Sequence, residues 1–156
     1  MSGLIANAPV NVPAPVQISS GAFWPAVDVA QLRERLRLDH SVTDARLIHA
    51  VSHAIATVNR ELATWRQAQS ALGLTALEKM SDQQINGLSV HTLLYLRAID
   101  GFVCAEIADR YRGYDATRSG DQRAEGVHTT SDDYRRDARF AIRDLLCKPR
   151  VTVDLI

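Results

Sequence analysis

Two histidines one helical turn apart are the residues whose types and spacing come closest to a chemical motif. His49 and His53 are four positions apart, which places both on one face of a helix, as in zinc-binding pairs. The metalloprotease motif requires Glu directly after the first His, and Ala50 stands there instead. No cluster that would supply a third ligand is apparent. We therefore expect two histidines at a surface or bundle edge and no metal site.

Other catalytic arrangements are not apparent in the sequence either. Cys104 and Cys147 lie far apart without metal-type spacing, and Cys104 belongs to an apolar run, typical of a small buried side chain. No Cys/His or Ser/His grouping indicates a nucleophile, and no glycine-rich loop indicates a phosphate site. We expect no enzyme, no cofactor and no catalytic residue.

Composition narrows the class of protein. The 156 residues fit one domain, and 46% hydrophobic and 23% charged residues are ordinary for a globular chain. The zero net charge argues against a protein that mainly grips nucleic acid. All cations except Lys79 and Lys148 are arginines, which reflects either codon bias or the suitability of arginine for interfaces. No signal peptide or membrane-spanning run is visible, so we expect a soluble protein made in the cytoplasm.

The elements that would position such residues begin with an extended arm, residues 1–27. Pro9, Pro13, Pro15 and Pro25 exclude regular helix there. The arm is nevertheless apolar and ends in Phe23-Trp24-Pro25, its expected anchor. An apolar arm is a liability in water, so it packs either on its own core or on a neighbouring molecule.

A helical bundle domain is predicted for residues 28–147. Asp28 would cap a short helix at 28–38, and Thr43 would cap a long helix at 43–69. Residues 70–88 read as a connection with helical turns, in which Ser81 to Gln84 have capping-box spacing. Ser89 would cap the most apolar helix, 89–113. Gly101 inside that helix costs about 1 kcal/mol relative to Ala, unless a neighbouring helix approaches closely.

The third long helix is predicted at 121–146, weakened near Gly126. Its apolar stripe is surrounded by charged residues, and Asp132–Arg136 is spaced as an ion pair. The charged face is either solvated or forms an interface between subunits in a ring. The candidates for such an interface are Arg135, Arg136, Asp137, Arg139 and Arg143.

The chain closes with an extended tail, residues 148–156. Pro149 stops the helix, and from Arg150 onward apolar and polar residues alternate as in a strand. No partner strand is evident in the rest of the chain. A lone strand leaves its backbone groups unpaired, so pairing with another protein is the expected resolution. The candidate binding residues are Pro149, Arg150, Val151, Thr152, Val153, Asp154, Leu155 and Ile156.

The fold class expected is all-α: three long helices and a short one, with the two extended ends. One alternative is a small helical DNA-binding regulator. Arg33, Arg35 and Arg37 lie on a short helix before a break and a new helix, which can be arranged as a helix-turn-helix. The neutral net charge and the length of the following helix argue against it.

Several stretches together resemble the head completion (stabilisation) proteins, gene product L, of contractile-tailed temperate phages of the peduovirus type. The resemblance covers nearly the whole chain and is carried by Phe23-Trp24-Pro25, VNRELATWRQAQ from Val58, AEIADRYRGYDATRSG from Ala105, YRRDARFAIRD from Tyr134 and KPRVTVDLI from Lys148. The order and spacing of these stretches are specific, although none is a catalytic signature.

The resemblance implies a structural adaptor in the virion, assembled in the host cytoplasm. Such proteins dock under the portal after DNA packaging as a ring of about twelve copies, matching a dodecameric portal. They stabilise the filled head and offer a platform to a tail-side completion protein. Packaged DNA passes through the ring without sequence-specific binding, and no membrane is involved.

Overall fold

The computed structural model describes residues 16–80, 83–115 and 130–150, with the backbone alone for 111–115. The predictions for the first three prolines, the Ser81 capping box, Gly126 and residues 151–156 lie outside these ranges. No helix in the described ranges is both long and apolar enough to cross a membrane.

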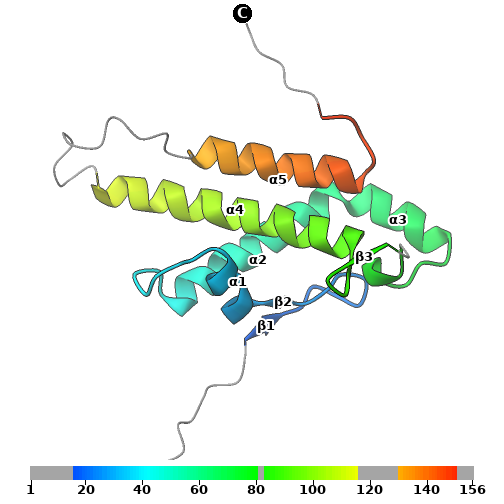
Figure 1. The fold of residues 1–156 in the computed structure, drawn as a ribbon, viewed down its shortest axis with the longest axis horizontal. Coiled ribbons are helices and arrows are strands. Elements are labelled where there is room, and N and C mark those ends of the chain that lie inside the picture. The colour runs from blue at the N-terminus through cyan, green and yellow to red at the C-terminus, as the bar shows by residue number, and fades with distance from the viewer. Residues whose placement is uncertain (1–15, 81–82, 116–129, 151–156) are drawn as a thin grey trace, which may run out of the picture.

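The architecture is mainly helical, as predicted (Figure 1). The described helices are α1 (Val29–Arg35), α2 (Asp44–Glu61), α3 (Ala63–Ala71), α4 (Val90–Asp115) and α5 (Ser131–Leu145), with a 3₁₀ turn η1 at Leu77–Met80. Figure 1 shows α4 and α5 running side by side in opposite directions. Helix α2 also packs on α4, so α4 contacts both neighbours and forms the centre of the bundle.

Two short antiparallel strand pairs correct the all-α expectation. β1 (Gln17–Ile18) pairs with β2 (Val27–Asp28), and β3 (Gln84–Ile85) pairs with β4 (Leu88–Ser89). The second pair is a hairpin within the predicted connection 70–88. Asn86 and Gly87 turn it with φ of 52° and 77°, the left-handed conformations that an Asn-Gly turn supplies. The expectation that the folded part lacks strands was therefore wrong.

The predicted helix starts are largely confirmed. The Asp28 carboxylate accepts the Gln31 N–H at 2.9 Å, and the Ser89 hydroxyl accepts the Thr92 N–H at 3.2 Å. Thr43 precedes α2, but its side chain makes no capping bond. Helix α5 begins at Ser131, where Thr130 and Asp133 cap each other reciprocally. The single helix predicted for 121–146 was therefore wrong at Thr130, where the backbone is extended with φ of −85° and ψ of 163°. Residues 121–129 lie outside the described ranges.

The single helix predicted for 43–69 is divided at Leu62. This residue has φ of −93° and ψ of 1°, ends α2 and precedes α3. Its side chain is fully buried, and the N–H of Arg66 still donates to its carbonyl at 2.8 Å. The division is thus a local change of backbone angle at a core position. Neither Gly nor Pro marks it in the sequence, which is why periodicity alone missed it.

An aromatic cluster ties the segment before α1 to the bundle. The Trp24 and Tyr95 rings stack with centroids 4.9 Å apart, and Phe23 meets Trp24 edge-on. The Tyr95 hydroxyl donates to the side-chain oxygen Oδ1 of Asn59 at 2.8 Å, and the side-chain Nδ2 of Asn59 donates to the Ser20 hydroxyl at 3.0 Å. Of the two packing alternatives for the arm, the structure places Phe23 and Trp24 in the core of their own chain.

Gly101 lies where α4 approaches α5 closely. A Cβ on Gly101 would sit 2.9 Å from the Ala138 Cβ and 3.0 Å from the Tyr134 carbonyl oxygen. Residues with a side chain would therefore force the two helices apart. Of the two possibilities that the sequence left open for this glycine, the structure shows the close approach of a neighbouring helix.

Candidate interaction surfaces

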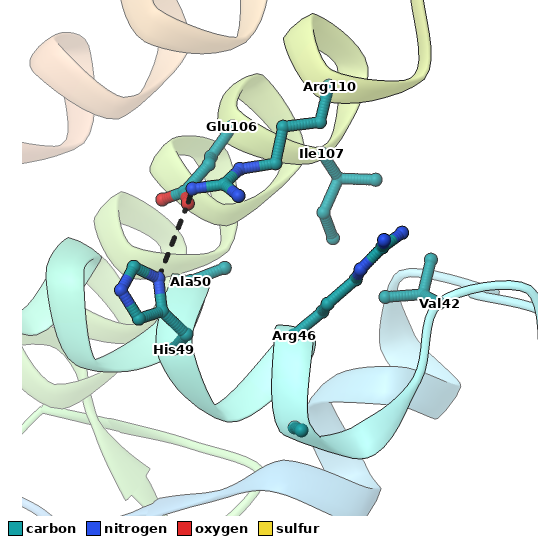
Figure 2. A pocket seen from close by; sticks show the side chains of 8 residues that line it. Val42, Arg46, His49, Ala50, Glu106, Ile107 and Arg110 are labelled. Atoms are coloured by element: carbon teal, nitrogen blue, oxygen red, sulfur yellow. Dashed lines mark hydrogen bonds and ion pairs between the residues drawn. The ribbon is translucent and has the colours of Figure 1, made fainter. Parts of the chain in front are cut away.

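A charged groove runs across the face formed by three helices. Residues of α2 and α4 line its whole length, and Arg135 and Arg139 of α5 line one end. It consists of two adjoining hollows of about 360 and 580 Å³, which share His49, Glu106 and Arg110. Figure 2 shows the first hollow: the Arg110 guanidinium lies beside Glu106, and the Arg46 side chain points toward Ile107 and Val42. We call the two hollows together the arginine groove.

Glu106 occupies the junction of the two hollows. Its side chain is 17% exposed and pairs with the Arg110 guanidinium at 2.8 Å. The Nδ1 atoms of His49 and His53 lie 3.7 and 3.4 Å from its carboxylate oxygens (Figure 2 shows the first). The two histidines are about 70% exposed, in keeping with a surface position. No group of three or more potential ligands among the described residues could hold a metal ion.

The groove contains more arginine than its own carboxylates neutralise. Arg135 pairs with Asp109 and with Asp132, and Arg110 pairs with Glu106. Three further arginines have no ion pair with any described carboxylate, namely Arg46, Arg60 and Arg139. Across both hollows five arginines face three carboxylates, and apolar side chains such as Phe102 and Ile107 lie between them. The groove therefore combines positive charge with apolar surface.

The five charged residues proposed on α5 for a subunit interface point in different directions. Arg135 and Arg139 line the groove. Arg136 pairs with Asp133 at 2.9 Å and lies 3.9 Å from Asp137. Asp132 pairs with Arg135, so the predicted Asp132–Arg136 pair was wrong. Arg136 pairs with Asp133 at i,i+3 instead, because the Asp133 carboxylate, which also caps the helix, lies nearer to it.

The beginning of the tail lies against the end of α5. The Arg143 side chain donates to the Pro149 carbonyl at 2.7 Å, which holds the chain as it leaves the helix. Arg150 forms a two-bond ion pair with Asp144, and its guanidinium covers the Phe140 ring at 5.4 Å. The bond from Arg150 lowers the pKa of the Asp144 carboxyl below its usual range. Residues 151–156 lie outside the described ranges, so their predicted strand stays a prediction.

Two of the three arginines of the DNA-binding alternative, Arg33 and Arg35, are engaged within the chain. Arg33 donates to the Asp39 and Val42 carbonyls at 2.9 and 2.8 Å and pairs with Asp44. Arg35 forms two bonds to the Asp100 carboxylate of α4, at 3.1 and 3.0 Å. These contacts fix the loop between α1 and α2 and attach α1 to α4. They use the guanidinium groups that a DNA phosphate would need.

Sequence reasoning did not find the arginine groove. Most of its residues come from three helices, and Arg46, Glu106 and Arg110 have no spacing that indicates a chemical site. The i,i+4 spacing of His49 and His53 was the one signal. It predicted that both histidines share one face of α2, but not that Glu106 of α4 lies opposite them. Juxtaposition across the bundle depends on helix packing, which the spacing within one helix does not contain.

The fold and surface define a small helical protein with a charged groove, and comparisons with known proteins give its family. The phage head completion protein (GPL) family matches residues 18–156. The head completion/stabilization protein of Escherichia phage P2 is 36% identical over 139 residues, covering 89% of this chain and 82% of the relative. No solved structure matches significantly. The chain belongs to the phage head completion protein family.

Proposed function

We propose that the chain is a structural adaptor of the virion, which docks as a ring on the portal after DNA packaging and stabilises the filled head. It would also provide the platform on which the tail-side protein assembles. Membership of the head completion family is the observation that carries this proposal. The expected absence of catalysis agrees with the structural role named for the P2 relative.

The geometry at the end of α5 supports docking through the tail. Arg143 and Asp144 hold Pro149 and Arg150 against the helix, so the chain leaves the described structure from a fixed point. A segment that starts from a fixed point loses less conformational freedom on binding than one on a mobile linker. The alternating sequence from Val151 to Leu155 suits addition of a strand to a portal sheet.

A binding assay with purified portal rings tests the docking proposal. The full chain is compared with a chain that ends at Arg150, which keeps every tail contact described on α5. We expect the shortened chain to keep its melting temperature and to lose detectable portal binding. Undiminished binding by the shortened chain would refute docking through residues 151–156.

A pair of substitution variants controls for the length of the tail. Val151→Asp with Val153→Asp places charge on the face expected to be apolar, whereas Thr152→Ala with Asp154→Ala changes the opposite face. Only the first pair should abolish portal binding. Equal loss in both would show that the alternation of side chains is not what the portal recognises.

A further inference from the structure

We propose that the arginine groove of one copy receives the outer ridge of α5 from a second copy, so that successive copies join head to tail. The outer ridge consists of Asp133, Asp137, Phe140 and Asp144. This inference rests on the proposed function, because it names the contact that would close the ring. It assigns a partner to a groove that the docking proposal leaves unused.

The ridge has the chemistry that the groove lacks. Its residues recur at spacings of four, three and four, which aligns them along one face of the helix. The ridge has three carboxylates but only two arginine partners, because Arg136 pairs with Asp133 and Arg150 pairs with Asp144. Asp137 is 51% exposed, and Phe140 lies under Arg150 and outside the core cluster. The ridge is thus an aromatic side chain flanked by acids.

The groove offers matching surface for each part of that ridge. Arg46, Arg60 and Arg139 lack a carboxylate partner among the described residues, so acidic side chains of another chain could form ion pairs with them. Apolar side chains between the two sets of charges offer room for an aromatic ring. A helix that lays its ridge into a groove between two others is an ordinary packing mode. Aromatic residues and arginine are also enriched at protein–protein interfaces.

The two surfaces of one copy cannot meet each other. At 3.6 residues per turn, Arg135 and Arg139 lie on one flank of α5, and Asp137 and Phe140 lie roughly a third of a turn or more away. Arg139 lines the groove of its own chain, whereas the ridge faces away from it. Contact between two different surfaces generates a heterologous interface, which forms a ring when the rotation closes.

The groove fits a protein surface better than a DNA backbone. Glu106 and Asp109 lie among the arginines, and both would repel phosphates. Interfaces with DNA are strongly positive and polar, whereas this groove is partly apolar and its excess charge is small. The chain as a whole also has zero net charge. A second copy of the chain is therefore the occupant that the charges favour.

Charge reversal on either surface tests the interface. The ridge variant is Asp137→Arg, and the groove variant combines Arg46→Asp with Arg139→Asp. DNA-filled heads made without this protein are incubated with each purified variant, and bound copies per head are counted. Each variant alone should bind at least about tenfold less well than the wild-type chain, because every contact in the ring then pairs like charges. Unchanged melting temperatures show that both variants fold.

Mixing gives the decisive result. In an equal mixture, the altered ridge of one variant meets the altered groove of the other, and the remaining wild-type surfaces meet each other. We expect binding to return to within about twofold of wild type, as it should for the single chain that carries all three substitutions. The exposed Lys79→Glu serves as a matched control and should bind normally.

The outcomes separate this inference from the proposed function. If the wild-type chain does not bind filled heads, the proposed function itself fails. If the wild-type chain binds but both variants bind equally well, or the mixture fails to recover, the head-to-tail contact is wrong and docking stands. The groove would be assigned to DNA instead if the groove variant alone lost binding and free duplex DNA competed with the binding of the wild-type chain.

Discussion

Arg150, at the start of the tail, is joined to Asp144 of α5 by two hydrogen bonds, one of 2.9 Å. The same guanidinium covers Phe140, and Arg143 holds the preceding carbonyl of Pro149. The last turn of α5 and Pro149 and Arg150 are therefore held together. If the proposed docking is right, breaking these contacts should affect docking more than folding.

Arg150→Ala should weaken portal docking while leaving the melting temperature essentially unchanged. The pair is exposed, so it contributes little to stability, but its loss frees the tail and adds an entropic cost to binding. Titration of portal rings with the variant measures the effect, with Lys148→Ala as a neighbouring control. A normal affinity for Arg150→Ala would show that the fixed exit point has no role.

Gly101→Ala should destabilise the protein by up to about 2 kcal/mol. The gain in helix propensity is about 1 kcal/mol, and overpacking against Ala138 and the Tyr134 carbonyl costs roughly 1–3 kcal/mol or more. Chemical denaturation gives the difference. Adding Ala138→Gly should recover part of the loss, because it removes the nearest atom. A more stable Gly101→Ala variant would contradict the close approach of α4 and α5.

Truncating the aromatic cluster should have graded effects. Trp24→Ala removes the ring stacked on Tyr95 and should cost about 3–5 kcal/mol in the free energy of unfolding. Tyr95→Phe keeps the ring but removes the hydroxyl and its bond to the Asn59 side chain, which should cost about 1 kcal/mol. Leu72→Ala, at a 77% exposed position, is the control and should stay near wild type. Urea unfolding of the three variants checks the order, and equal costs for all three would contradict it.

Stability should fall in mildly acidic solution because of His91. This ring stacks on Trp65, its buried Nδ1 has no hydrogen-bond partner among the described residues, and burial lowers its pKa from 6.5. Below pH 6.5 the unfolded chain therefore binds the proton first, and stability is lost until the folded form is protonated as well. His91→Phe should reduce the loss between pH 7 and 5, measured by urea unfolding. An unchanged slope would exclude His91 as the cause.

The features predicted well from sequence are those determined within one turn or one helix. The Asp28 and Ser89 caps, the course of α4 and the close approach at Gly101 all follow from local spacing or local steric cost. The Asn86-Gly87 hairpin was also a local signal, but the surrounding polar run was read as helical turns. The break at Leu62 carries no local signal, because nothing but burial distinguishes that leucine.

The candidate surfaces depend on packing between elements, so the sequence revealed only their parts. It supplied the charged residues of α5 but not that Arg139 and Asp137 face different neighbours. Glu106 appeared as one acid in a long helix, and its importance comes from two histidines on α2 and one arginine on α4. Contacts between residues that are far apart in the sequence can be predicted only when the packing of the helices against one another is known.

Complementation of DNA-filled heads tests the central claim, a head-completion role exercised through the tail, most directly. Heads made without this protein are incubated with the full chain or with a chain ending at Arg150, then challenged with nuclease and supplied with tails. The account predicts that the full chain protects the DNA and yields infectious particles, whereas the shortened chain does neither. Full protection and infectivity with the shortened chain would contradict it.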